Sequence, residues 1–140
     1  MIQRKVNIIL ERLAQLGKIV PKDQQNYLSA DFTVQKATEK ILQELVEAAC
    51  DINTHILVEE GKNPPEEYRK SFLLLGEYGL LPLALMEALA PAGGLRNVLV
   101  HLYENLDNAK VHEAARKAQD LFPRYIQAVT QYLQKRKPTS

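Results

Sequence analysis

The sequence predicts an all-α protein, a bundle of four to six helices that occupies residues 1–140 as one domain. Apolar residues recur at steps of three and four along the chain, and no stretch shows the strict alternation of a β-strand. A chain of 140 residues with 46% hydrophobic residues is long enough for one hydrophobic core and too short to favour a second. Short connections between the predicted helices fit a helical bundle.

Net charge and cysteine content narrow the class of protein. A net charge of +1 argues against broad, sequence-independent binding to nucleic acid, because such binding needs many contacts from lysine and arginine to phosphate. The single cysteine, Cys50, rules out an internal disulfide, and its apolar neighbours predict a small buried side chain. The N-terminal sequence MIQRKVNIILERL lacks the apolar run of a signal peptide, and no window is long and apolar enough to cross a bilayer. We therefore expect a cytoplasmic protein without a membrane partner.

The first part of the chain predicts two helices. Apolar residues of one helical face recur over residues 2–16, and Gly17 follows as a stop signal. A polar turn is expected over residues 21–26. Residues 31–60 contain no proline or glycine and are followed by Gly61, which predicts one long helix. Its apolar residues lie nearly all the way round, as is typical of a helix in the middle of a bundle.

Prolines and glycines divide the middle of the chain into shorter helices. In NPPEEYRKSF, two prolines and two glutamates stand where a helix N-terminus favours them, and one apolar face continues until Gly76 and Gly79. Residues 83–89 predict a short helix that ends at Pro91 and the glycine pair after it. A further helix is expected over residues 96–105.

The last helix is expected to begin after Asp107, a favourable N-cap residue, and to continue to about Leu133. Pro123 lies inside it and should kink or split it, because proline cannot donate a helical hydrogen bond. The basic tail QKRKPTS is expected to fray over about residues 135–140.

The segment AGGLRNVLVHLY carries the polar residues that point to a function. On a helical wheel, Asn97 and His101 fall on the side opposite the leucines and valine, and Tyr103 lies nearly in line with Arg96, two turns later. Because two glycines precede Arg96, we expect it near the start of its helix. Unpaired N–H groups and the helix dipole favour anions at such a position.

An arginine and a histidine directed at one spot suit phosphate chemistry. Imidazole has a reference pKa of ~6.5 and can transfer protons near neutral pH, while a guanidinium can bind a phosphate and stabilise its developing charge. RNA supplies its own nucleophile, the 2′-hydroxyl, so such a site needs no metal, and no Cys/His cluster has zinc-ligand spacing. The alternative interpretation is that Arg96 forms a surface salt bridge and that His101 is a solvated or packed residue.

A second set of polar residues lies on the predicted long helix. Glu44, Glu47, Asp51 and His55 follow one another at steps of three, four and four and form one stripe, opposite which other polar groups are expected. Asp51 either orients the motif arginine or histidine, or belongs to a solvated stripe in which it pairs with His55. For Glu44 and Glu47 we prefer the solvated interpretation. Four other residues are assigned to surface or packing positions: Cys50, His112, Tyr125 and Tyr132.

The R-x-x-x-x-H-x-Y pattern in GLRNVLVHLY resembles the signature of the HEPN superfamily, and the chain as a whole resembles its HepT branch. The resemblance extends over nearly the whole chain. It includes the stretches ACDINTHIL and PPEEYRKSF and the residues Tyr103-Glu104-Asn105, which begin at the motif tyrosine, with Leu95 in place of a more usual aromatic residue. The resemblance implies a HEPN-type helical bundle that forms a homodimer, with the two motifs meeting across the twofold axis, and a metal-independent endoribonuclease activity.

The resemblance also implies residue roles and partners. Arg96 and His101 would be the catalytic residues, with Asn97 and Asp51 in support and with no cofactor of the protein's own. HepT proteins are toxins of type VII-like toxin–antitoxin systems, in which a minimal, MntA-like nucleotidyltransferase transfers AMP from ATP to the motif tyrosine, here Tyr103. The substrate would be RNA, with transfer RNA as one candidate. The alternatives are a non-enzymatic module that binds a nucleotide and docks the nucleotidyltransferase, and a degenerate scaffold.

Overall fold

The computed structural model describes residues 1–101 and 106–136, and for His101 only the helical backbone. Every regular element in this part of the chain is an α-helix, which confirms the predicted all-α class. The six helices are α1 (Ile2–Ile19), α2 (Gln24–Leu28), α3 (Phe32–Glu59), α4 (Tyr68–Glu77), α5 (Leu83–His101) and α6 (Asn108–Arg136).

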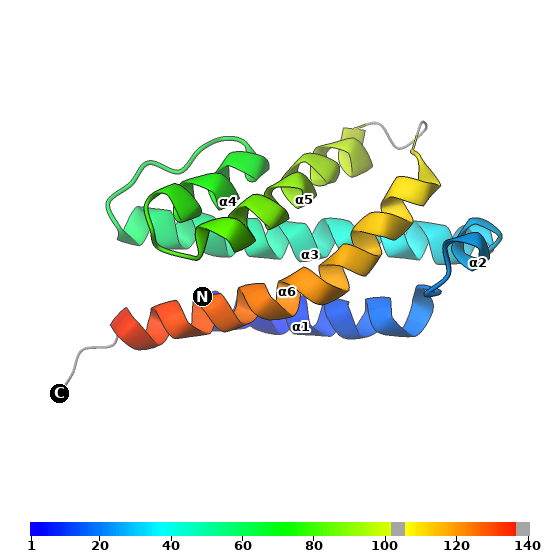
Figure 1. The fold of residues 1–140 in the computed structure, drawn as a ribbon, viewed down its shortest axis with the longest axis horizontal. Coiled ribbons are helices and arrows are strands. Elements are labelled where there is room, and N and C mark those ends of the chain that lie inside the picture. The colour runs from blue at the N-terminus through cyan, green and yellow to red at the C-terminus, as the bar shows by residue number, and fades with distance from the viewer. Residues whose placement is uncertain (102–105, 137–140) are drawn as a thin grey trace.

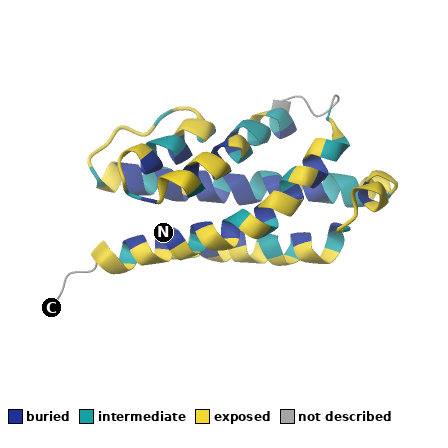
Figure 2. Cartoon of the chain, in the orientation of Figure 1, coloured by how far each residue is buried: buried dark blue, intermediate teal, exposed yellow. Residues whose placement is uncertain are grey.

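The helices form a bundle in which α3 lies in the middle. α1 and α6 lie on one side of α3, α4 and α5 lie on the other, and α2 connects α1 to α3 at one end (Figure 1). Buried residues line the inward faces of the helices, whereas the outward faces are exposed (Figure 2). α3 has buried residues on several sides, as its apolar circumference predicts.

The predicted boundaries of the longest helices lie close to the observed ones. α1 begins as predicted and continues past Gly17. Asp31 caps α3, since its carboxylate accepts a hydrogen bond from the backbone N–H of Val34 at 3.1 Å. Asp107 caps α6 in the same way, accepting from the backbone N–H of Ala109 at 3.0 Å. Both helix starts are therefore specified by local sequence.

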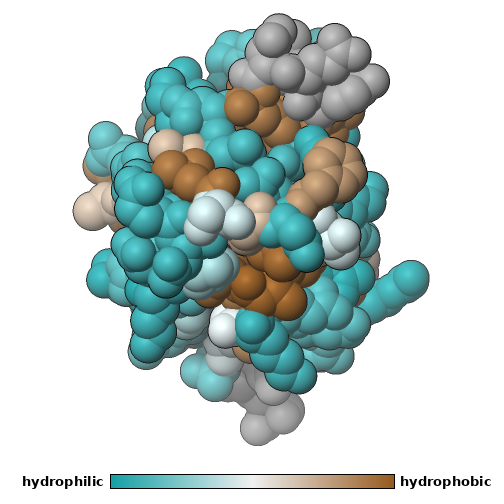
Figure 3. Space-filling model, turned by 90° about the vertical axis from the view of Figure 1, so that its right-hand side faces the viewer, coloured by the Kyte–Doolittle hydropathy of each residue, from teal (hydrophilic) through white to brown (hydrophobic). Residues whose placement is uncertain are grey.

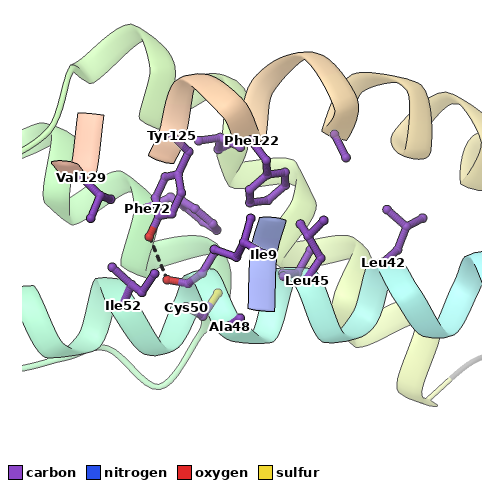
Figure 4. Packing of buried hydrophobic residues seen from close by; sticks show 14 of the residues in the cluster. Ile9, Leu42, Leu45, Ala48, Cys50, Ile52, Phe72, Phe122, Tyr125 and Val129 are labelled. Atoms are coloured by element: carbon purple, nitrogen blue, oxygen red, sulfur yellow. Dashed lines mark hydrogen bonds between the residues drawn. The ribbon is translucent and has the colours of Figure 1, made fainter. Parts of the chain in front are cut away.

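Aromatic residues from α4 and α6 fill the centre of the core (Figure 4). Phe72 and Phe122 each meet Tyr125 edge to face, with ring centroids 6.0 and 5.9 Å away. The Tyr125 hydroxyl is directed toward α3, where it lies 3.0 Å from the Ala49 carbonyl oxygen and 2.5 Å from Asn53 Oδ1. Burial raises the pKa of Tyr125 well above its usual value, so the hydroxyl stays protonated as a donor.

A short helix occupies part of the region that the sequence predicts as a polar turn. α2 places Tyr27 in the interior, fully buried, with its ring centroid 5.2 Å from that of His112 on α6. A helix of five residues has little stability of its own, so this contact between distant parts of the chain stabilises it. The local sequence does not contain that information.

α5 is one continuous helix, so the prediction of two helices separated by Pro91 is wrong. Pro91 is exposed, where water can bind the carbonyl group that lacks a helical donor. Gly93 is buried because α4 comes so close that a Cβ atom at this position would lie 2.5 Å from the backbone nitrogen of Arg69. Close packing on α4 therefore compensates for the poor helix propensity of this segment.

α6 also continues through a proline. Of the two outcomes predicted at Pro123, a kink or a split, the helix does not split, and its axis changes direction along its length, as a kink predicts (Figure 1). Lys135 and Arg136 belong to the helix and not to a frayed tail, because Arg136 Nη1 pairs with Glu60 Oε1 at 2.5 Å. Residues 137–140 lie outside the described part of the chain.

The composition of α5 corrects the expectation that no window could cross a membrane. Judged by length and composition alone, Leu83–Val100 is one described segment that could, with a mean hydropathy of 1.3. The same helix packs against α3 and α4, and 28% of the residues in this window are buried.

Candidate active site

Arg96, Asn97 and the backbone of His101 lie at the end of α5 and not at the start of a helix. α5 begins at Leu83, several turns before Arg96, so the predicted attraction of anions by unpaired N–H groups at Arg96 is wrong. Asn97 follows on the exposed side of the helix. The side chain of His101 and the whole of Tyr103 lie outside the described residues, so their predicted positions stay predictions.

Two neighbours hold the guanidinium group of Arg96. Its Nε and Nη2 atoms donate to one oxygen, Oε2 of Glu47 on α3, at 3.0 and 2.6 Å. Its central carbon lies 4.5 Å from the centre of the Tyr68 ring at the start of α4, within range of a cation–π interaction. The Arg96 side chain is 17% exposed, so this pair is better shielded from water than a surface salt bridge.

Counted over the described residues, the contacts with Glu47 and Tyr68 leave part of the Arg96 guanidinium for a ligand. Glu47 receives the N–H of Nε and one N–H of Nη2, and the remaining donors are on Nη1 and Nη2. These two atoms form the second edge of the guanidinium, whose parallel N–H groups match two oxygens of a phosphate. Arg96 can therefore bind a phosphate while its pair with Glu47 is kept.

Cationic groups lie opposite the polar stripe of α3, as predicted. Lys5 Nζ on α1 lies 2.7 Å from Asp51 Oδ2, and Arg12 Nη2 lies 3.5 Å from Glu44 Oε2. These contacts join α1 to α3 along the same face on which Glu47 meets α5.

The carboxylate that contacts Arg96 is Glu47, one turn before Asp51 on α3. The interpretation of Glu47 as a merely solvated residue is therefore wrong, because α5 brings Arg96 to this level of α3. The interpretation that Asp51 pairs with His55 is also wrong, since Asp51 pairs with Lys5 and His55 Nε2 lies 3.0 Å from Glu59. An interaction of Asp51 with the histidine of the motif stays a prediction.

A groove of about 360 Å³ lies beside this cluster, between α1 and α3. Its wall includes both residues that hold Arg96, together with two cations and two further carboxylates: Lys5, Arg12, Glu44, Glu47, Asp51 and Tyr68. Positive and negative groups alternate here, so the groove offers both donors and acceptors to a polar ligand next to Arg96.

Other reactive side chains pack in the interior, as predicted. His112 is buried, with Nε2 2.6 Å from the carbonyl oxygen of Pro21. Burial raises the pKa of the Cys50 thiol to about 12, so the thiol stays protonated and is a poor nucleophile. Tyr132 is buried as well and donates its hydroxyl to Glu60 at 2.5 Å.

Sequence reasoning missed Tyr68 and undervalued Glu47. Tyr68 has the spacing of an ordinary apolar residue at the start of a helix, and Glu47 and Asp51 are equivalent members of one stripe. Which carboxylate faces Arg96 depends on the level at which α5 crosses α3. No local sequence pattern specifies where α5 crosses α3. The polar stripe did indicate that polar partners lie opposite it.

The family model described as ribonuclease HepT-like matches residues 9–129, which include the whole motif from Arg96 to Tyr103. The chain belongs to the HepT-like ribonuclease family. This membership confirms the resemblance that the motif and the flanking stretches indicated. The matched residues of this HepT-like protein also include both members of the ion pair between Arg96 and Glu47.

Two relatives of this HepT-like protein are named as nucleases. The chain is 35% identical over 132 residues to the tRNA nuclease HepT of Aphanizomenon flos-aquae, covering 94% of this chain and 89% of the relative. It is 31% identical over 129 residues to the mRNA nuclease HepT of Shewanella oneidensis, covering 88% and 96%. The HepT-like chain is therefore a ribonuclease, and the names of its relatives differ in the class of RNA.

A solved structure supports the same assignment. The HepT-like chain matches a tri-AMPylated HEPN toxin of Shewanella oneidensis, solved in complex with the MNT antitoxin, with a TM-score of 0.82 and 28% sequence identity. The match covers 93% of this chain and 96% of the toxin. It confirms the predicted HEPN-type bundle for the HepT-like chain.

Proposed function

We propose that this ribonuclease is the toxin of a toxin–antitoxin pair and that it cleaves RNA through Arg96 and His101. The observation that carries the proposal is the partly buried Arg96, which Glu47 and Tyr68 orient while one edge remains for phosphate. Asn97, exposed on the next position of α5, would contact phosphate or ribose. We propose transfer RNA as the first substrate to test, because the relative at 35% identity is named for it.

The proposed reaction needs two groups at one phosphodiester. His101 would accept the proton of the 2′-hydroxyl as its oxygen attacks phosphorus, and the imidazolium so formed would deliver a proton to the 5′-oxygen as the bond from phosphorus to that oxygen breaks. The products are a 2′,3′-cyclic phosphate and a 5′-hydroxyl. Arg96 would stabilise the additional negative charge on the phosphate oxygens in the transition state. These steps use no cofactor, and we propose the cytoplasm as their location.

We further propose that the active form is a homodimer, in which α5 meets α5 of a second copy. A groove of about 220 Å³ between α5 and α6 has mainly apolar walls, which include Ala88, Ala92, Leu95 and Leu121. Figure 3 views a different side of the molecule, the end of the bundle where α2 lies, and shows apolar surface between hydrophilic areas there. Lys110, Glu113 and Lys117 border the groove. Lys117 Nζ lies 2.9 Å from Glu113 Oε1 within the chain, so in a twofold arrangement Lys110 of one copy can approach Glu113 of the other.

The dimer can be tested at an exposed alanine of this groove. Ala88→Glu places a carboxylate on the apolar surface and is expected to weaken dimerisation and RNA cleavage together, because burial of an unpaired charge is costly. Sedimentation equilibrium and cleavage assays at matched protein concentrations measure both. Ala14→Glu, at an exposed position of α1, is the control and should change neither. A monomeric Ala88→Glu variant that cleaves RNA at the wild-type rate would contradict the shared-site proposal.

We propose that a nucleotidyltransferase silences this toxin by transferring AMP from ATP to Tyr103. The support is the AMPylated toxin of Shewanella oneidensis, which was solved with its antitoxin, and the sequence position of Tyr103. Seven residues after Arg96 on a helical wheel, Tyr103 is expected nearly in line with it. An AMP group there would place a bulky anion where the phosphate of RNA should bind.

Replacement of Tyr103 by phenylalanine is expected to separate cleavage from silencing. Expressed without a nucleotidyltransferase partner, wild type and Tyr103→Phe should both arrest growth and cleave RNA, because the hydroxyl is not part of the proposed reaction. Coexpressed with the partner, the wild type should gain mass in steps of AMP and lose toxicity, whereas Tyr103→Phe should do neither. Intact-mass spectrometry and colony counts measure the two effects.

The same experiment separates the proposed function from its alternative. A wild type that cleaves no RNA and leaves growth unaffected would favour a non-enzymatic module that docks the nucleotidyltransferase. A Tyr103→Phe variant that still receives AMP and becomes harmless would place the acceptor elsewhere.

A further inference from the structure

We infer that Tyr68 is a positioning residue for RNA cleavage, which holds Arg96 so that its free edge is presented to the scissile phosphate. This inference rests on the proposed role of Arg96. The Tyr68 ring lies against the face of the guanidinium, 4.5 Å from its central carbon, while Glu47 holds one edge. The Tyr68 ring thus restrains the orientation of the guanidinium plane, and the pair with Glu47 restrains rotation within that plane.

The position of Tyr68 is determined by buried polar contacts. Ser71 Oγ donates to the Tyr68 carbonyl oxygen at 2.8 Å, and Asn53 Nδ2 on α3 donates to Ser71 Oγ at 3.0 Å. Asn53 Oδ1 lies 2.5 Å from the hydroxyl of Tyr125 on α6. Asn53, Ser71 and Tyr125 are fully or almost fully buried, so loss of a partner would be costly and the chain of contacts is rigid.

The backbone of α5 is held against the same residue. A Cβ atom at Gly93 would lie 2.7 Å from the carbonyl carbon of Tyr68, so α5 and the start of α4 touch through their backbones at this point. Arg96 follows Gly93 by three residues, on the same side of α5. The short approach at Gly93 therefore places the guanidinium over the Tyr68 ring.

This geometry has a consequence for the reaction. An arginine side chain has many rotamers, and those that point elsewhere do not stabilise the transition state. A ring on one face restricts these rotamers without using any N–H donor, because a cation–π contact is made by the face of the guanidinium. Tyr68 therefore leaves the remaining Nη1 and Nη2 donors to the phosphate.

Substitutions at Tyr68 test this inference. Tyr68→Phe keeps the ring and is expected to stay within about twofold of the wild type, whereas Tyr68→Leu should lower kcat/KM for RNA cleavage by roughly 3- to 30-fold. Tyr68→Met is a second variant without a ring, whose flexible side chain fills space in case Tyr68→Leu folds poorly. Urea unfolding of each variant shows whether a loss of activity follows a loss of stability.

A double-mutant cycle provides a readout that packing alone would not change. In an Arg96→Lys background the guanidinium is absent, so Tyr68→Leu should cause a clearly smaller further loss of kcat/KM than in the wild type. Losses that multiply, or a stably folded Tyr68→Leu variant with wild-type kcat/KM, would overturn the inference. If the wild type itself cleaves no RNA, the proposed function fails first, which distinguishes the two results.

Discussion

Replacing Arg96 with alanine is expected to lower kcat/KM for RNA cleavage by roughly 100- to 1,000-fold, because it removes the donors that would stabilise charge on the transferred phosphate. The protein should still fold. Arg96 lies near the end of α5, and its partner Glu47 has a side chain that is 31% exposed, so water can solvate the carboxylate once the arginine is gone.

A matched arginine makes this result specific. Arg124 on α6 is 61% exposed and pairs with Asp120, so Arg124→Ala removes the same charge from the surface and should leave cleavage within about twofold. Arg96→Lys should be intermediate, because an ammonium keeps the charge and loses the two parallel donors. Initial rates on a transfer RNA, with circular dichroism for helix content, measure the effects. Equal activity of Arg96→Ala and Arg124→Ala would exclude Arg96 from the reaction.

Replacing Gly93 with alanine is expected to destabilise the protein by roughly 3 kcal/mol, near the upper end of the usual cost of overpacking. The added Cβ atom would lie 2.5 Å from the backbone nitrogen of Arg69 and 2.7 Å from the carbonyl carbon of Tyr68. A backbone cannot change rotamer to make room, so α4 and α5 must move apart. Since this contact also places Arg96 over Tyr68, activity should fall together with stability.

The next residue is the control for this prediction. A Cβ atom at Gly94 would have no heavy atom within 4 Å, so Gly94→Ala adds no clash and should stabilise α5 by about 0.5–1 kcal/mol through better helix propensity. In urea unfolding, the free energy of unfolding should therefore fall below the wild-type value for Gly93→Ala and rise above it for Gly94→Ala. Equal effects of the two substitutions would contradict the close approach of α4 to Gly93.

Local patterns predicted those elements whose ends and faces depend on nearby residues. Spaced apolar residues predicted α1, the absence of proline and glycine over residues 31–60 predicted α3, and Asp107 predicted the start of α6, because a cap acts within one turn. The same reasoning failed at Pro91 and Gly93, where local propensity argues for a break, and at Pro123 the helix continues instead of splitting. In the folded protein, burial of α5 and α6 against their neighbouring helices outweighs that propensity.

Periodicity and motif spacing are local properties, so the helical class, the motif around Arg96 and the family followed from the amino-acid sequence. Two features of the site depend on the packing of the helices: Glu47 rather than Asp51 contacts Arg96, and Tyr68 covers the face of its guanidinium. Those choices depend on where α5 crosses α3 and α4. The crossing is set by contacts such as that of Gly93 with the backbone of α4, between residues far apart in the chain.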